Sequence, residues 1–392
     1  MRVMVAAFGD AGHAFPAISL ARALSGRGHE VVVESWERWR EPVEELGLEF
    51  VAAEQYTVFP PPAAGSGDVS AAAAARTLVP FLRDWKPDAV VSDILTLAPA
   101  LAAEAVGVPW ATLIPHPYPE TPTGMPFFAS GARAPRTGAG RALWRAWGPL
   151  LRLGLRQGRA ELNEQREAVG LAPTERFHGG VSERLALVAT FPQLEYQRPW
   201  PRSVFVTGPM DFEVPHPDIE LPPGDAPLVL VAPSTAKDLE ARLVRAALDG
   251  LAEEPVRVVA TTNLMRPKEP IAVPSNAVLV DWVSYSQVLA QADLVICHGG
   301  HGTTVRALGA GVPALCSPIA GDMAENAVRV AWAGAGLSLS WRLCRPAPLR
   351  WTVRRVLGDP RFRRRAGELA AWRRENDGAQ RGAKLVEHFA AG

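Results

Sequence analysis

The chain has 392 residues, more than a single hydrophobic core usually holds, which predicts two domains. Hydrophobic residues make up 48% of it and charged residues 21%, a composition that excludes a disordered chain. The 41 basic residues balance the 41 acidic ones, which argues against a general electrostatic attraction to nucleic acid or to an anionic membrane.

Cysteine usage and the apolar runs indicate the compartment. Cys297, Cys316 and Cys344 are odd in number and widely spaced, which favours buried thiols over a disulfide framework or a zinc site. No apolar run reaches the roughly 20 residues that span a bilayer. The short run after Met1 is typical of a first strand and not of a signal peptide. We expect a cytoplasmic protein without integral membrane association, present as a monomer or a homodimer.

In the N-terminal half, short apolar runs alternate with helical patterns, which is typical of βαβ units and a parallel sheet. A helix is predicted to begin at Pro16, with its apolar residues on one face. A stretch rich in proline, aromatic residues and arginine, 116–200, interrupts this alternation and contains at least one long helix, over about 141–168. The predicted strands are 2–8, 30–35, 48–53, 89–93, 110–115 and 185–190.

The second half repeats this alternation after a segment dense in proline, glycine and acidic residues, which indicates a linker. The predicted strands are 228–233, 256–261, 277–282, 294–298 and 314–318, and the final helices are near 347–357, 361–375 and 378–390. The predicted units are an N-terminal domain (1–207), a linker (208–227), a C-terminal domain (228–375) and a last helix (376–392) that packs back on the first domain.

Ligands of open α/β sheets bind beyond the carboxyl ends of the strands, where the strand order reverses. In the first half, the loop after the first strand carries His13, and the fourth strand ends at Asp93. A carboxylate beside an imidazole fixes its tautomer and stabilises the protonated ring, as a general base requires. The alternative interpretation is that both residues only cap helices.

The second half places a polar, glycine-rich turn at the equivalent point. The sequence "VICHGGHGTT" (295–304) joins a strand to a helix predicted to begin near Thr303, and Ser234 and Thr235 follow the neighbouring strand. Glycines allow a close backbone approach, and a helix N-terminus suits a phosphate. We interpret the turn as a cradle for a diphosphate. The turn matches neither a dinucleotide fingerprint nor a P-loop, and the alternative is a turn that binds no ligand.

Three stretches resemble bacterial family 1 glycosyltransferases of the GT-B fold, in the macrolide or antibiotic branch. They are "GHAFPAISLARALSGRGHEVVV" (12–33), "KPDAVVSDILTLAPALAAEAVGVP" (86–109) and the segment 281–336, which contains the glycine-rich turn. The resemblance implies two Rossmann-like α/β/α domains that face each other across a cleft. It also implies transfer of a sugar from a nucleotide-diphosphate sugar to a hydroxyl group, with inversion at the anomeric carbon.

The resemblance also assigns roles. His13 would deprotonate the acceptor, oriented by Asp93, and Trp282 would stack on the nucleotide base. Asp322 would bind sugar hydroxyls. No metal and no cofactor are expected, because the helix end and polar side chains would absorb the charge of the leaving group. The predicted donor-binding residues are Ser234, Thr235, Trp282, Val283, His298, Gly299, Gly300, Gly302, Thr303, Asp322 and Met323.

Three departures from the family pattern concern the donor. Arg306 stands where members often have a glutamate that holds the ribose hydroxyls, and arginine cannot accept those hydrogen bonds. Met323 replaces a polar residue near the sugar, and the run from Trp282 to Tyr285 differs at the base-binding position. The first two changes favour a dTDP-deoxysugar over a UDP-hexose as the donor.

The acceptor is expected to be a hydrophobic natural product bound near His13. The candidate contacts are Gly12, Phe59, Tyr118, Phe127, Phe128 and Trp144, although several of these could equally be core residues. Two alternatives stay open. One is a catalytically impaired helper protein. The other is a transferase for a lipid acceptor, and the lack of an evident basic amphipathic helix near the N-terminal loops argues against it. A nicotinamide dehydrogenase is disfavoured because the turn after the first strand lacks the required glycines.

Overall fold

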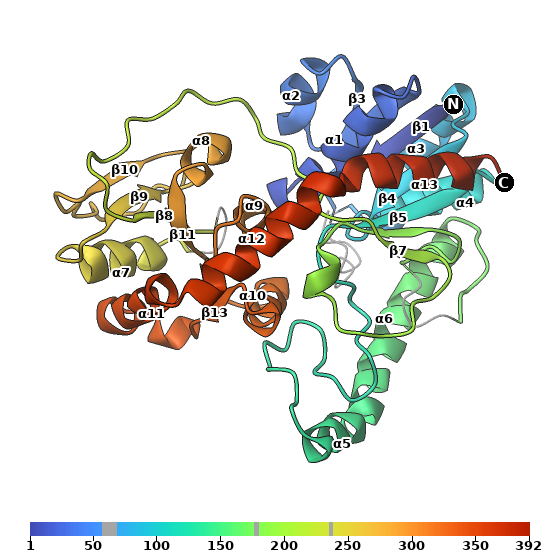
Figure 1. Ribbon diagram of the computed structural model, residues 1–392. Coiled ribbons are helices and arrows are strands. Elements are labelled where there is room, and N and C mark those ends of the chain that lie inside the picture. The colour runs from blue at the N-terminus through green and yellow to red at the C-terminus, as the bar shows by residue number, and fades with distance from the viewer. Residues whose placement is uncertain (57–68, 176–179, 235–237) are drawn as a thin grey trace.

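The computed structural model describes residues 1–56, 69–175, 180–234 and 238–392. Two lobes, each built on a parallel sheet, lie side by side (Figure 1). The N-terminal sheet has the order β3-β2-β1-β4-β5-β6-β7, and the C-terminal sheet has the order β10-β9-β8-β11-β12-β13. The predicted α/β class with two Rossmann-like domains is therefore confirmed, and both sheets reverse their order beside the first strand, at β1/β4 and at β8/β11.

The N-terminal sheet is covered on both faces. Alternate residues of β1, such as Val3 and Val5, pack towards α1, whereas Met4 packs towards α3 and α4. The strands are β1 (Arg2–Ala6), β2 (Glu30–Ser35), β3 (Glu49–Ala52), β4 (Ala89–Asp93), β5 (Trp110–Ile114), β6 (Ala186–Val188) and β7 (Val204–Val206). The helices are α1 (Ala11–Ser25), α2 (Arg40–Glu44), α3 (Ala71–Trp85), α4 (Leu97–Ala105), α5 (Gly138–Ala146) and α6 (Gly148–Ala168).

The C-terminal sheet is built in the same way, with α7 and α11 on one face and α9, α10 and α12 on the other. Its strands are β8 (Leu228–Ala232), β9 (Arg257–Thr261), β10 (Ala277–Val280), β11 (Ala292–Cys297), β12 (Ala314–Cys316) and β13 (Gly336–Ser338). Its helices are α7 (Arg242–Leu251), α8 (Tyr285–Leu289), α9 (His301–Gly309), α10 (Asp322–Ala333), α11 (Pro346–Gly358) and α12 (Pro360–Glu375).

The last helix, α13 (Gly378–Ala390), leaves the C-terminal lobe and lies on the N-terminal lobe (Figure 1). Its residues Ala383 and Val386 belong to the N-terminal core. Its Glu387 binds Arg27 at 2.6 Å and His29 at 2.7 Å, both just beyond the end of α1. The end of the chain therefore ties the two lobes together a second time.

Some predicted elements differ from the structure in their ends or number. The helix expected to begin at Pro16 begins at Ala11, because the carbonyl of Asp10 already accepts the N–H groups of His13 and Ala14 at 2.9 Å. The region where at least one long helix is expected, about 141–168, holds two helices, and Pro149, which lacks an N–H group, lies just after the break between them. The strands β7 and β13 are additional; both have only three residues, too few for a clear pattern.

Candidate functional site

The reversal of strand order in the N-terminal sheet brings His13 and Asp93 together, as the sequence predicts. Asp93 is the last residue of β4, and His13 lies in the first turn of α1, which follows the adjacent strand β1. The Nδ1 atom of His13 lies 2.8 Å and 3.0 Å from the two carboxylate oxygens of Asp93. The Asp93 side chain is fully buried and also accepts the N–H of Leu95 at 2.9 Å. This second bond fixes the carboxylate.

The surroundings of His13 favour its protonated form. Burial lowers the pKa of His13, but the charge and hydrogen bond of Asp93 and the charges of Asp322 and Asp10 outweigh burial. The pKa therefore lies above its ordinary value of 6.5. When the ring is neutral and Nδ1–H donates to Asp93, the lone pair is on Nε2. The arrangement can accept a proton at Nε2 and stabilise the resulting charge.

The glycine-rich turn connects β11 to α9 at the second reversal of strand order. The helix α9 begins at His301, two residues earlier than the sequence predicts, with Gly300 at its N-cap. Within the described part of the chain, no side chain caps this end. The N–H groups of its first turn therefore lack partners within the helix, and its dipole is positive at this end. An anion is the ligand that such a helix end favours.

A cleft of about 310 Å³ is lined by residues of both lobes. His13 and the glycine-rich turn therefore face the same space. From the N-terminal lobe it is lined by Gly12 and His13. Of the predicted donor-binding residues it is lined by Ser234, Trp282, His298, Gly300, Gly302, Thr303, Asp322 and Met323. The structure thus gathers most of the predicted site residues in one place, and their roles stay predictions.

Gly299 and Val283 lie behind the cleft. Gly299 has φ +86°, and a Cβ atom there would lie 2.7 Å from the carbonyl oxygen of Met323. Its own carbonyl accepts the Asn326 side-chain amide at 2.9 Å. The side chain of Val283 is buried in the C-terminal core and does not line the cleft. The predictions for Thr235 and Phe59 lie outside the described residues.

The predicted acceptor contacts fall in different surroundings. Tyr118 is buried in a small core cluster with its ring 5.7 Å from Trp200, so the structure favours the core interpretation for it. The ring of Phe127 packs edge-on against Trp144 at 5.4 Å. The ring of Phe128 lies 5.2 Å from that of His116, a residue of the cleft. Phe128 is therefore the aromatic candidate closest to the base in this chain of contacts.

Two histidines of the cleft were not predicted. His116 follows β5, and its Nδ1–H donates to the Pro117 carbonyl at 2.8 Å, while burial and the charge of His13 lower its pKa. His301 contacts the Thr190 hydroxyl at 2.9 Å, and burial with the charges of the other two histidines lowers its pKa to about 3. The pKa values of both rings therefore lie below that of His13. Their position beyond strand ends is the sequence signal that could have found them.

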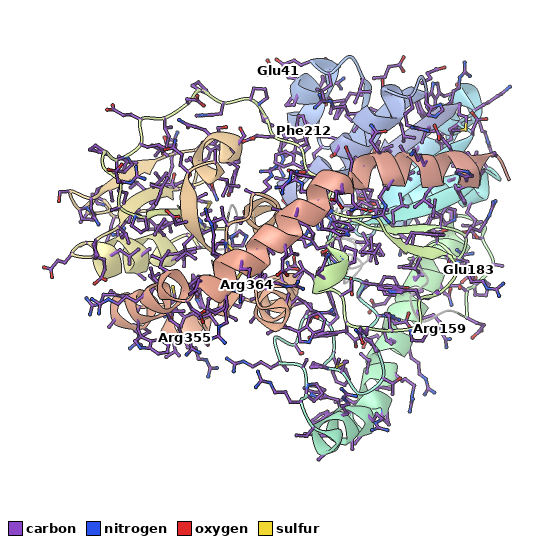
Figure 2. The ribbon with its side chains drawn as sticks, in the orientation of Figure 1. Glu41, Arg159, Glu183, Phe212, Arg355 and Arg364 are labelled. Atoms are coloured by element: carbon purple, nitrogen blue, oxygen red, sulfur yellow. The ribbon has the colours of Figure 1, made fainter. Side chains whose placement is uncertain are left out.

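Arg306 occupies the position where the resemblance implies a glutamate. It is buried, and it donates a hydrogen bond to the carbonyl of Phe212, which lies where the linker leaves the N-terminal lobe (Figure 2). Its guanidinium lies 5.2 Å from the ring centres of Phe15 and Tyr285 and 4.0 Å from the Asp211 carboxylate. Arg306 therefore connects α9 to the linker and to α1.

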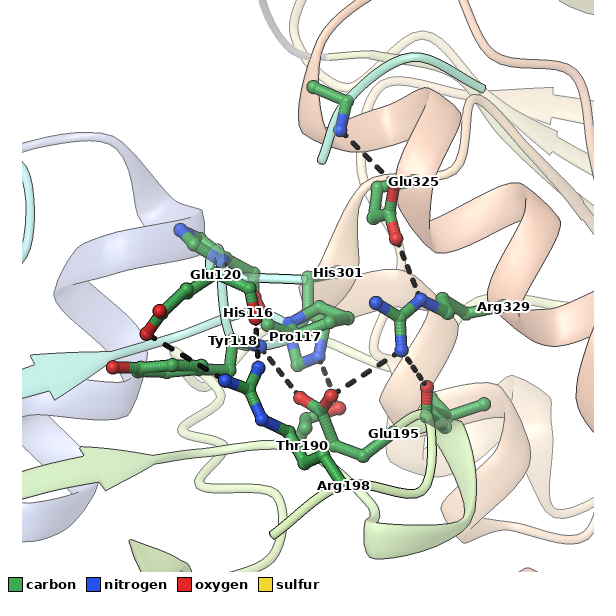
Figure 3. Close-up of polar contacts among 12 residues, drawn as sticks. His116, Pro117, Tyr118, Glu120, Thr190, Glu195, Arg198, His301, Glu325 and Arg329 are labelled. Carbon is green, nitrogen blue, oxygen red and sulfur yellow. Dashed lines mark hydrogen bonds and ion pairs between the residues drawn. The ribbon is translucent and has the colours of Figure 1, made fainter. Parts of the chain in front are cut away.

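A second group of polar contacts joins the lobes behind the cleft (Figure 3). Glu325 of α10 accepts the N–H of Ala129 at 3.1 Å and pairs with Arg329 at 2.7 Å. Arg329 in turn donates to the carbonyl of Leu194 at 3.0 Å and lies 3.4 Å from the Glu195 carboxylate. These buried contacts hold the helix that begins at the predicted sugar-binding residue against the other lobe.

Other features of the chain bear on the remaining classes of site. Cys297, Cys316 and Cys344 are buried free thiols, as predicted. Among the residues that the structure describes, no group of three or more His, Cys, Asp or Glu side chains could hold a metal ion. Within the same residues, no helix is both long and apolar enough to cross a membrane.

Known proteins resemble this chain over most of its length. Residues 245–380 match the family described as "Erythromycin biosynthesis protein CIII-like, C-terminal domain". The 4'-demethylrebeccamycin synthase of Lentzea aerocolonigenes is 30% identical over 94% of each chain. The glycotransferase of kitacinnamycin superposes with a TM-score of 0.80 at 21% identity over 99% of each chain. The glycosyltransferase VinC, solved in complex with dTDP, superposes with a TM-score of 0.70 at 21% identity over 100% of each chain. The protein therefore belongs to the macrolide and antibiotic branch of the family 1 glycosyltransferases, with the GT-B fold.

Proposed function

We propose that the enzyme transfers a sugar with inversion from a nucleotide-diphosphate sugar to a hydroxyl of a hydrophobic acceptor. Nε2 of His13 accepts the proton of the acceptor hydroxyl, and the oxygen attacks the anomeric carbon. The bond from that carbon to the diphosphate breaks, and the nucleotide diphosphate leaves with the electron pair. The observation that carries the proposal is the His13–Asp93 pair at 2.8 Å, which faces the first turn of α9 across one cleft.

The departing diphosphate is stabilised by α9 and not by a metal ion. Thr303 and His298 line the cleft beside the first turn of α9, and in this proposal their side chains and the first-turn N–H groups face the negative charge of the diphosphate. Because these donors are already in position, the charge needs no reorganisation of the protein. Activity is therefore expected to survive treatment with EDTA, and loss of turnover that added Mg²⁺ restores would contradict this part.

The donor is a dTDP-sugar in this proposal. Arg306 is committed to the linker carbonyl of Phe212 and has no acceptor atom for a ribose hydroxyl. A thymidine nucleotide has one ribose hydroxyl fewer to satisfy than a uridine nucleotide. The dTDP bound to VinC, a protein of the same fold, supports this choice. Met323 at the cleft adds apolar surface, which suits a deoxysugar.

The acceptor is a hydrophobic natural product. Ring contacts lead from His13 in the cleft to His116 and then to Phe128, which places an aromatic side chain next to the part of the cleft that holds the base. The relative from Lentzea aerocolonigenes, a synthase of a rebeccamycin compound, supports an acceptor of this class.

The decisive experiment compares His13→Ala with the wild type in single-turnover assays and in calorimetric binding of a nucleotide diphosphate. The variant should lose about 10²–10⁴-fold in turnover and keep its nucleotide affinity, because the base lies on the other lobe. His216→Ala, a change of an exposed linker histidine, is the matched control and should retain both. Transfer by His13→Ala near the wild-type rate would reject the base assignment. Wild-type protein that transfers no sugar from any donor, yet alters a partner's activity, would favour the helper interpretation.

A further inference from the structure

The helices α5 and α6 form an arm that projects from the N-terminal lobe, with the loop that leads into α5 running beside it (Figure 1). We use "the arm" for residues 138–160. No side chain of α5 is buried, and the buried ones of α6, Leu162 and Arg166, lie beyond the arm. Arg159, labelled in Figure 2, marks where α6 rejoins the body and binds the Glu175 carbonyl at 2.7 Å.

The arm exposes large apolar side chains that a soluble surface normally hides. Leu143 is 61% exposed and Leu153 is 62% exposed, and Trp147, Leu150 and Leu151 are exposed as well. Contiguous exposed apolar residues of this size mark a surface that another body covers. Helices in proteins gain most of their stability from packing an apolar face, and these exposed leucines do not supply that packing. The exposed apolar residues of the arm are therefore typical of a docking surface.

The charge of the arm and its surroundings indicates what kind of partner fits. Residues 121–160 contain seven arginines, no lysine and no acidic residue, although the whole chain has a net charge of zero. This segment is therefore strongly basic, although basic and acidic residues are equal in number over the whole chain. A second copy of this chain would bring like charges together, which disfavours a self-complementary dimer through this surface.

The two kinds of side chain lie on opposite faces. Leu143, Trp147 and Leu150 are spaced by four and three residues, which places them on one side if the helix continues through the short break. Arg141 and Arg145 each lie two residues from Leu143, which is about half a turn away around the helix. Arg152 likewise lies two residues after Leu150, and Arg156, four residues further on, lies on the same side as Arg152. The arm is thus a basic amphipathic helix, which the sequence alone did not reveal.

We propose that the arm docks the protein peripherally on an anionic lipid bilayer. Leucine and tryptophan side chains would enter the boundary between headgroups and acyl chains, while the arginines would bind lipid phosphates. Tryptophan is favoured at this depth because its ring is apolar and its N–H is polar. This proposal concerns binding alone and holds whichever sugar the enzyme transfers.

Aromatic contacts connect the arm to the cleft. Trp144 of the arm packs on Phe127 at 5.4 Å, and the next residue, Phe128, packs on His116 at 5.2 Å. The ring of His116 lies 6.4 Å from that of His13. An apolar acceptor that partitions into a bilayer would therefore be concentrated beside the lobe that holds the base.

The test is flotation of the full-length protein with vesicles of phosphatidylcholine alone or mixed roughly 3:1 with phosphatidylglycerol, at about 50 mM salt. The wild type should float at least about tenfold more with the anionic vesicles, and less at high salt. Leu150→Ser/Leu153→Ser and Arg152→Gln/Arg156→Gln should each lose most of this binding. The matched control is Trp351→Ser, which changes an exposed aromatic residue of α11 and should bind as the wild type does.

Folding is checked by the melting temperature and the nucleotide affinity. The arm variants should match the wild type in both, because the substituted side chains are not buried. Three results would overturn the proposal: wild-type protein that floats with neither kind of vesicle, equal flotation with both kinds, or arm variants that bind like the wild type. If the wild type bound no vesicles but bound polyglutamate, and the arm variants did not, the surface would bind an acidic protein partner and the membrane proposal would be wrong.

Discussion

The buried guanidinium of Arg329 lies 3.4 Å from the centre of the Tyr196 ring, so a charge on one lobe packs against an aromatic ring of the segment between β6 and β7. Glu325, one turn earlier in α10, balances this charge at 2.7 Å. Because α10 begins at Asp322, the same contacts that hold the lobes together also fix the end of the helix that lines the cleft.

Replacement of Arg329 by alanine should destabilise the protein severely, because Glu325 is left buried without its counter-ion. The free energy of unfolding should fall by about 3–5 kcal/mol, measured by urea denaturation. Arg40→Ala is the matched control, since Arg40 pairs with Glu37 at 2.6 Å on the surface, where solvent screens the pair. Equal, small losses for both variants would contradict the role of Arg329.

The pH dependence of turnover should report His13. Only the neutral ring accepts a proton, so kcat/KM should fall as the pH drops through the pKa of His13, above 6.5. Asp93→Asn removes the attraction that raises this pKa while burial, which lowers it, remains. The acid limb should therefore move to lower pH, and the plateau should fall about 10²–10⁴-fold because the tautomer is no longer fixed. If the acid limb of the kcat/KM profile stayed at the same pH in Asp93→Asn, a group other than His13 would be responsible for it.

Calorimetric titration with dTDP and with UDP tests the donor. Arg306 offers no acceptor for a ribose hydroxyl, and an unpaired hydroxyl in a closed site costs about 1–3 kcal/mol. We expect UDP to bind about tenfold more weakly than dTDP. Arg306→Gln supplies a carbonyl oxygen and should narrow the difference. UDP binding as tight as dTDP binding would remove the basis for a thymidine donor.

The part of the site that could be predicted follows from topology and local motifs. Strand order alone places His13 beside Asp93, because β1 and β4 are neighbours, Asp93 ends β4, and His13 follows β1 at the same edge of the sheet. The glycine-rich turn could also be recognised from the sequence, since three glycines at a strand end indicate tight turns or a close backbone approach. His116 obeys the same edge rule, yet a single histidine in a proline-rich segment has no pattern that sets it apart.

What could not be predicted depends on contacts between distant segments. Arg306 is held by the carbonyl of Phe212, and no periodicity in the linker specifies where that carbonyl lies. The strands β7 and β13 are three residues long, so neighbouring strands and not their own sequence determine them. Gly336 illustrates this, because any side chain there would collide with the carbonyl of Ala314 in β12.

Substitution of two glycines of the turn should have different effects on stability and on nucleotide binding. Gly302 has open space around its Cβ position and lies in a helix, so Gly302→Ala should raise the free energy of unfolding by about 0.5–1 kcal/mol. The added methyl group faces the cleft and should weaken dTDP binding. Gly299→Ala should instead lower stability, because φ is +86° and Met323 blocks the side chain. Unchanged dTDP affinity in Gly302→Ala would place the diphosphate elsewhere.

Glu34, near the end of β2, provides a test of stability against pH. Burial raises its pKa from 4.5 to about 8, and its Oε2 atom has no hydrogen-bond partner within the described structure. Between these pH values the folded state holds a proton that the unfolded state has lost, so stability falls as the pH rises, by at most about 1.4 kcal/mol per pH unit. Glu34→Gln replaces the carboxyl group with an amide that does not titrate in this pH range. In thermal unfolding, the variant and the wild type should therefore be about equally stable below pH 4.5, and the variant should be the more stable near pH 8. A difference between them that stays constant across this window would show that Glu34 is already ionised in the folded protein.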